Sequence, residues 1–169
     1  MSPKKCRAFT VTELLLTLLI LSITTLIALD AVADTDANMR AERAAREAVS
    51  AVRFARTRAM TDATTYKVRF NVGAKTISVI DPNNSDAIMA GPLAGNLMQI
   101  NLSGNSDVAN VSMAVSIAGD ASDPFDVIFN SLGGTSNSGT ITFTYGSISK
   151  VLQIPNVGDP YLVGDSRQP

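Results

Sequence analysis

The stretch FTVTELLLTLLILSITTLIAL, residues 9–29, carries a single ionisable side chain, Glu13. From Leu14 to Leu29 the chain runs for sixteen residues without a charge. The twenty residues counted from Thr10 would extend roughly 30 Å as an α-helix, close to the thickness of the hydrocarbon core of a bilayer. The sequence therefore predicts one membrane-spanning helix over residues 9–29.

The residues on either side of this stretch indicate its orientation. Lys4, Lys5 and Arg7 precede it, with no acidic residue among positions 1–8. Positive charge next to a membrane helix marks the cytoplasmic side, so we expect the chain after the helix to lie outside the cytoplasm. A secretory signal peptide cleaved after Ala33 would show a similar pattern, and its removal would release a soluble binding domain.

The motif Ala8-Phe9-Thr-Val-Thr-Glu13, followed by the long apolar stretch, resembles the type III signal of type IV prepilins and type II secretion pseudopilins. The resemblance implies that residues 1–8 are a leader peptide and that prepilin peptidase cleaves between Ala8 and Phe9. It also implies that Phe9 becomes N-methylated and that the partners are other pilin or pseudopilin subunits. Gly usually precedes the cleavage site in this family, so with Ala8 we expect slower processing.

Glu13 has a physical role that fits this resemblance. Cleavage frees an α-amino group at Phe9, and a carboxylate four residues later can neutralise it, in the same subunit or in a neighbour. In the family, this Glu is understood to set the register of the incoming subunit. A discarded signal peptide has no use for such a residue, because an unpaired carboxylate near hydrocarbon is costly. We therefore expect Glu13 to act in assembly.

The next segment, residues 30–62, is rich in Ala, Arg and Glu and contains no Gly or Pro, which favours an amphipathic helix continuing into the globular domain. We predict a nearly continuous helix over residues 9–60, with a bend or local melting between 28 and 38, where aspartates lower helix propensity. Apolar residues at spacings of three and four predict its buried face. These residues are Ala41, Ala45, Ala48, Val52, Ala55 and Ala59.

Arg43, Arg46 and Arg53 fall on another face of this predicted helix. The interpretation we favour is a solvated or strand-packing face, in which the long side chains cover apolar surface. A second interpretation is contact with acidic surfaces of neighbouring subunits. The third is binding to DNA phosphates, as in a DNA-binding competence minor pilin, but no aromatic residues lie between the arginines on that face. We do not expect nucleic acid to be the main partner.

After residue 62 the apolar pattern changes to the alternation typical of strands. Runs at 66–72 and 76–80, separated by a Gly-Ala-Lys turn, predict a β-hairpin. Residues 63–169 are therefore predicted to form a β-rich domain, and the predicted fold class is α+β, a long helix packed on a mostly antiparallel sheet. Further alternating runs occupy residues 98–102, 108–117, 127–130, 139–145 and 148–154.

A second resemblance lies in this half of the chain. Residues 48–60 and the first hairpin resemble the start of the domain of the minor pseudopilin GspH and the minor pilin FimT, and residues 127–133, with the two strands that follow, resemble its close. The resemblance implies a pilin-like fold and a structural subunit of a type II secretion pseudopilus, which serves protein secretion, or of a type IV pilus. It also implies a single-pass protein of the bacterial inner membrane with a periplasmic carboxyl-terminal domain.

The composition argues against several classes of function. The chain of 169 residues has no His and one Cys, Cys6 in the predicted leader, so it lacks the residues for a catalytic His, a His or Cys metal cluster or a disulfide framework. The oxygen-bearing side chains of Asp81, Asn83, Ser85 and Asp86 have some of the spacing of a calcium loop. However, Asp86 stands where that loop needs Gly and Pro92 where it needs Glu, so a polar turn is the favoured interpretation. We therefore expect no enzyme activity, no metal and no cofactor.

Overall fold

The structure of the chain is a computed structural model, and it divides into two compact units, Met1–Asp36 and Ala37–Pro169, each described here by itself. The predicted processing residues, Ala8 and Phe9, lie outside the described residues. The described residues are 10–81, 84, 87–91, 97–104, 107–119 and 122–163, with the backbone alone for residues 26–34.

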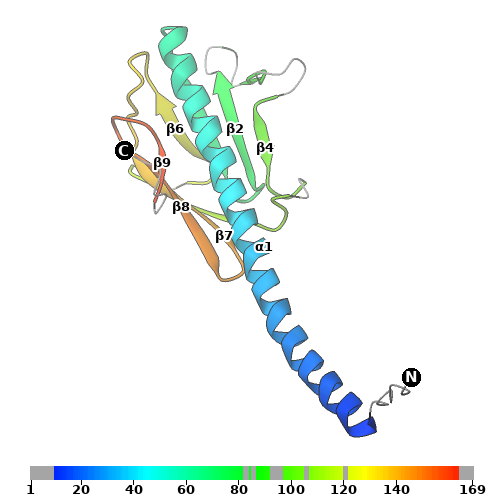
Figure 1. Cartoon of the computed structure of the whole chain (residues 1–169). Helices are drawn as coiled ribbons and strands as arrows, with labels where there is room; N and C mark the ends of the chain where they lie inside the picture. Colours follow the sequence, from blue (N-terminus) through cyan, green and yellow to red (C-terminus); the bar gives the residue numbers. More distant parts are fainter. Residues whose placement is uncertain are drawn as a thin grey trace, which may run out of the picture. The chain divides into compact units, whose positions relative to one another are not determined.

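Helix α1 runs without interruption from Val11 to Thr61 (Figure 1), which confirms the predicted long helix. Every residue between 28 and 38 is helical, so the local melting expected there is wrong. Asp costs at most about 0.7 kcal/mol relative to Ala in a helix, and helix formation propagates cooperatively through such positions. The helix ends where Ala63 adopts a φ of 49°, a left-handed conformation that closes helix ends.

In the carboxyl-terminal unit, the buried face of α1 is made of small side chains. Because these side chains are short, the helix can approach the sheets closely, and large strand residues such as Phe70, Phe129 and Phe143 fill the space between them. The predicted buried face is therefore confirmed. Its fully buried members are Ala41, Ala44, Ala45, Ala48, Ala51, Val52, Ala55 and Ala59.

The first sheet is antiparallel and has five strands. The predicted hairpin is its centre, with Lys67 opposite Ile80 and Asn71 opposite Thr76. The order is β3-β2-β1-β6, and β4 pairs with the same edge of the sheet as β3, along β2. The strands are β1 (Tyr66–Asn71), β2 (Thr76–Asp81), β3 (Ala87–Ile88), β4 (Gln99–Asn101) and β6 (Phe125–Phe129).

The second sheet is also antiparallel and has the order β5-β7-β8-β9. Its strands are β5 (Ser112–Ile117), β7 (Gly139–Tyr145), β8 (Ile148–Ile154) and β9 (Tyr161–Leu162). The runs predicted at 139–145 and 148–154 match β7 and β8 residue for residue. The α+β class with antiparallel sheets is confirmed.

Two parts of the strand prediction differ from the structure. The run predicted as a strand from residue 108 becomes β5 only at Ser112, because Val108 and Val111 are buried in a turn in which the Val111 amide donates to the Val108 carbonyl. The two-residue strands β3 and β9 were not predicted. Strands of two residues are too short to show an alternating pattern.

Candidate functional site

The apolar half of α1, from Val11 to Thr25, exposes nearly all of its side chains within its own unit. The large apolar residues each expose more than half of their surface, an arrangement that a single soluble domain rarely maintains. They are Val11, Leu14, Leu15, Leu16, Leu18, Leu19, Ile20, Leu21 and Ile23. Over the part of the chain that the structure describes, no helix combines the length and the mean hydropathy of a membrane span.

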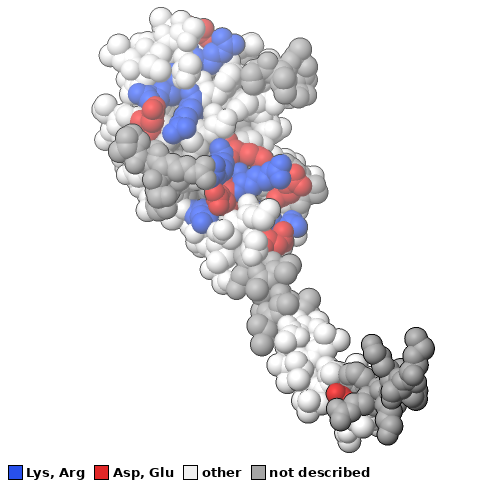
Figure 2. Space-filling model, in the orientation of Figure 1, with Lys and Arg blue, Asp and Glu red and all other residues white. Residues whose placement is uncertain are grey.

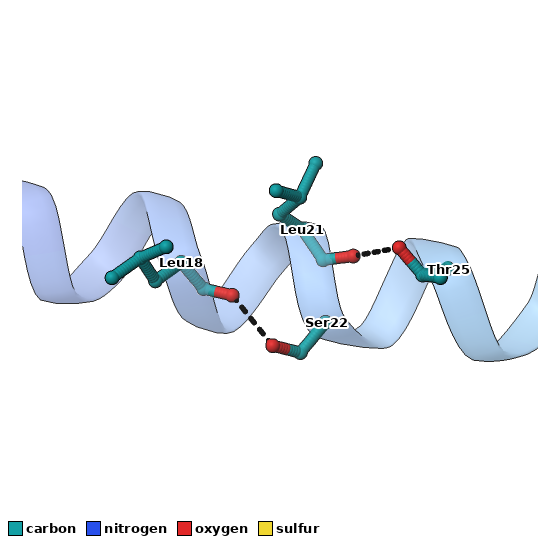
Figure 3. Close-up of a pocket in the computed structure, with 4 residues that line it drawn as sticks. All are labelled: Leu18, Leu21, Ser22 and Thr25. Carbon is teal, nitrogen blue, oxygen red and sulfur yellow. Dashed lines mark hydrogen bonds between the residues drawn. The ribbon is translucent and has the colours of Figure 1, made fainter.

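The hydroxyl groups of this segment are satisfied by the helix itself. Ser22 donates to the Leu18 carbonyl at 2.8 Å, and Thr25 donates to the Leu21 carbonyl at 2.7 Å (Figure 3). These four residues line a shallow depression of about 390 Å³. Thr17 is bonded in the same way to the Leu14 carbonyl. Because these hydroxyls already have acceptors, they need no water, so the segment can lie in an apolar surrounding at little cost.

Thr10 and Glu13 form the start of the helix. The Glu13 amide donates to the Thr10 hydroxyl at 3.3 Å, and Glu13 is the acidic residue of the first turn. A Thr followed three residues later by Glu is the pattern of a capping box, in which both side chains satisfy free amides. The sequence pattern Thr-Val-Thr-Glu could have predicted this cap. The expected pairing of Glu13 with the Phe9 amino group involves a residue outside the described part of the chain.

Two of the three predicted arginines, Arg43 and Arg46, lie on the exposed face of α1 beside acidic residues. Arg43 pairs with Asp107 at 2.9 Å and more loosely with Glu47 at 3.8 Å. The Arg46 Nε donates to the Glu42 carboxylate at 2.9 Å. Basic and acidic side chains accordingly alternate on this surface (Figure 2). The positive potential that a DNA phosphate would meet is reduced by these carboxylates.

Arg53, the third predicted arginine, belongs to the packing of the domain together with Arg56. Arg53 donates to the Pro160 carbonyl at 3.2 Å. Arg56 donates from Nε to the Gly133 carbonyl at 2.8 Å, and its Nη1 also bonds the Asp159 carboxylate. Both arginines thus hold segments more than 70 residues away against the helix. Arg56 was not among the predicted site residues, because nothing in the local sequence marks its distant partners.

Glu47, a half-buried residue of α1, has a carboxyl group whose pKa is shifted by its surroundings. Partial burial raises the pKa of its carboxyl group above the usual value of 4.5. Arg43 acts in the opposite direction, and the Asp107 carboxylate adds to the increase. The charged form of Glu47 is therefore less stable in the folded protein than in water.

Two aspartates close together in the sequence, Asp123 and Asp126, hold parts of the first sheet. Both carboxylate oxygens of Asp123 accept backbone amides of the β1–β2 turn, from Val72 at 2.8 Å and from Gly73 at 2.9 Å. Asp126 receives two hydrogen bonds from Arg69 at 2.8 Å. Within the described residues no three acidic, His or Cys side chains are grouped as metal ligands. Asp86, part of the calcium-loop pattern considered in the sequence, lies outside those residues.

Comparisons with known proteins agree with this geometry. The family model of GspH, the type II transport protein, matches residues 44–158. Among solved structures, the minor pseudopilin EpsH from the type 2 secretion system of Vibrio cholerae is similar, with a TM-score of 0.53 and 12% identity over 73% of this chain and 96% of that one. The type IV minor pilin FimU of Pseudomonas aeruginosa has a TM-score of 0.50 and 16% identity over 76% of this chain and 92% of that one. No curated protein sequence matches at a significant level.

The family match covers the second half of α1, the first sheet, strands β5, β7 and β8 of the second sheet and the turn at Gly133. It includes the parts that the resemblance in sequence indicated. The two solved structures share the fold, a long helix packed on antiparallel sheets. The chain therefore belongs to the GspH family of type II transport proteins, and it is a structural subunit of the minor pseudopilin or minor pilin type.

Proposed function

We propose that this chain is a minor subunit of a type II secretion pseudopilus, matured by cleavage between Ala8 and Phe9 and N-methylated at Phe9. The observation that carries the proposal is the combination of a GspH domain with an exposed apolar helix preceded by the Ala8-Phe9 signal. The family model, named for type II transport, favours the secretion system over the type IV pilus. The role is one of assembly with other pilin-type subunits, and no substrate is turned over.

In this proposal, residues 9–29 insert once into the inner membrane and the domain of residues 63–169 lies in the periplasm. The uncharged run from Leu14 to Leu29 supports insertion, because burying apolar surface is favourable by about 25 cal/mol per Å². The internal hydrogen bonds of Thr17, Ser22 and Thr25 support it too, since they remove the cost of dehydrating three hydroxyls.

Glu13 would have two roles in the same subunit. Its place in the first turn suits the helix dipole and the cap with Thr10. Its charge would neutralise the amino group of Phe9 in the same or the neighbouring subunit, which removes the cost of two unpaired charges next to hydrocarbon. The first role needs only a hydrogen-bonding side chain, while the second needs a negative charge.

The experiment that tests the proposal uses this difference. Glu13→Gln keeps a side chain that can complete the cap, and Glu13→Ala keeps neither the cap nor the charge. We expect both variants to enter the membrane and both to be absent from sheared or overexpressed pseudopili, measured by immunoblotting of membrane and filament fractions. Normal incorporation of Glu13→Gln with loss only for Glu13→Ala would mean that the cap, not the charge, is what assembly requires.

Arg43 and Arg46 would supply polar contacts between subunits. Their side chains remain 57% and 46% exposed in spite of the acidic residues beside them, so a neighbouring acidic surface could share them. Arg53 is exposed as well, but it would take a smaller part, because its guanidinium already donates to the Pro160 carbonyl. Exposed ion pairs of this kind contribute more to the choice of partner than to affinity.

A further inference from the structure

The edges of the two sheets differ in how they are protected from pairing with another chain. Strands β3, β4 and β9 have only two, three and two residues, and β6 carries Asp126 and is bridged at Phe129 to Thr135. Strand β5, with the sequence SMAVSI, is a six-residue edge strand without a charge or a proline. Natural proteins usually place charges, prolines or covering segments on such an edge, because it is a template for strand pairing.

The register of β5 shows which of its backbone groups face away from β7. The Ala118 amide donates to the Ser138 carbonyl on the β7 side. Because backbone groups alternate along a strand, the amides of Ser112, Ala114 and Ser116 also point toward β7. The amide and carbonyl groups of the other three residues therefore point outward, and no hydrogen bond to them from another described segment is present. These residues are Met113, Val115 and Ile117.

The side chains of β5 leave room for a second strand. Ser112, Ala114 and Ser116 are exposed on the outer face of the sheet, and all three are small and neutral. Met113 and Ile117 are buried against the core, and Val115 is half-buried between them. On the outer face of β5 itself, a strand placed beside it would meet neither a charge nor a bulky side chain.

We propose that β5 pairs in antiparallel orientation with β5 of a second copy of this chain, so that two second sheets join into one. The strand is complementary to itself, because both copies are neutral and present the same outward groups. In a register centred on Val115, Val115 lies opposite Val115 of the other copy, and Met113 lies opposite Ile117. In this register all three outward-facing residues of each copy form backbone hydrogen bonds to the other copy. The same register places Ala114 directly opposite Ser116 on the outer face. This proposal does not depend on incorporation into a filament.

The small area that two paired β5 strands would bury determines which assay can detect the dimer. Six paired residues bury far less than the about 800 Å² per partner of a standard stable interface, so the dimer is weak in free solution. Two chains held in one membrane or micelle meet at a much higher effective concentration. Covalent trapping is therefore a better assay than measuring the mass of the particle in dilute solution.

Disulfide trapping between two different single-cysteine chains tests the register directly. In a non-hydrogen-bonded antiparallel pair the Cα atoms lie about 4.5 Å apart, within the range that a disulfide spans. Full-length chains carrying Cys6→Ser with either Ala114→Cys or Ser116→Cys, each with a tag of different size, are mixed in detergent micelles and oxidised. We expect a covalent heterodimer in the mixture, and neither chain alone should form a dimer.

Val115→Pro provides the matched test of the hydrogen bonds. It removes an outward amide without touching the pairing with β7, and proline is tolerated in an edge strand when its nitrogen faces solvent. Added to both cysteine chains, it should abolish the heterodimer while the far-ultraviolet circular dichroism stays unchanged. No heterodimer in the original mixture would overturn the proposal. Dimers formed equally well by either chain alone would overturn it too.

Discussion

The Nε of Arg56 donates a hydrogen bond to the carbonyl oxygen of Gly133 at 2.8 Å, across 77 positions of the chain. This contact fixes the turn after β6 against the last turns of α1, and the Asp159 carboxylate holds the same guanidinium from another segment. Gly133 has a φ of 76°, a conformation in which other residues are strained. The turn that marks the family in sequence is therefore tied to the helix by an arginine that packs the domain.

Replacing Arg56 should destabilise the domain more than replacing Arg46. The Arg56 side chain is only 19% exposed, and Arg56→Ala loses a charged hydrogen bond to Gly133, for which we expect about 1.5–3 kcal/mol of unfolding free energy. The exposed pair of Arg46 with Glu42 lies four residues apart on one helix, so Arg46→Ala should cost at most about 0.5 kcal/mol. Urea unfolding of the two variants measures the difference. Equal costs would show that the contact with Gly133 does not stabilise the fold.

Among the glycines whose surroundings the structure describes, Gly139 should tolerate an added methyl group least. A Cβ at Gly139 would lie 2.4 Å from the Ser116 carbonyl oxygen and 2.8 Å from the Ile117 Cα, both backbone atoms of β5. Gly139→Ala must therefore push two paired strands apart, and we expect a cost of about 2–3 kcal/mol. Gly146→Ala is the control, because its φ of 58° is strained but nothing lies within 4 Å, so about 1 kcal/mol is expected. Thermal unfolding of both variants tests this order.

Glu47 should make the stability of the domain depend on pH in the acidic range. Since burial raises the folded pKa above 4.5, the folded state holds more protons than the unfolded state between the two values. The contribution of Glu47 to stability is therefore full below pH 4.5 and is lost as pH rises through the folded pKa. Glu47→Gln should gain stability relative to the natural protein at pH 7 and not at pH 4. Urea midpoints at both pH values test this, and a gain at pH 4 alone would contradict it.

The exposed arginines should not give tight binding to DNA at physiological salt. Arg43 and Arg46 are paired with acidic residues of this chain, and Arg53 is bonded to a backbone carbonyl. Few net positive charges remain to release counterions from the phosphates. A gel-shift titration should show only weak, salt-sensitive binding. Tight binding that is lost in Arg46→Ala and Arg53→Ala would show that this surface recognises DNA.

Much of the fold could be predicted from local patterns. The buried face of α1 and strands β7 and β8 followed from spacing alone, because each is long enough for its period to be visible. Val108 was misassigned because a buried residue in a turn and a buried residue in a strand look alike in sequence. The roles of Arg56 and Asp123 could not be predicted, since their partners lie 77 and about 50 positions away.

The candidate site was predicted less completely than the fold. Arg43, Arg46 and Arg53 were grouped by helical spacing, which places side chains on a face but does not say what they contact. All three are exposed, and the structure separates them by their partners: Arg53 donates to the segment before β9, whereas Arg43 and Arg46 pair with acidic side chains. The cap formed by Thr10 was not predicted, although the local sequence Thr-Val-Thr-Glu has the spacing of a capping box.

The most direct test of the proposed role is the intact mass of the mature protein recovered from membranes of cells that express prepilin peptidase. The account predicts a membrane-bound chain that begins with N-methylated Phe9 and lacks Cys6. A soluble protein that begins at Asp34 would contradict it, because the apolar helix and Glu13 would then have been discarded.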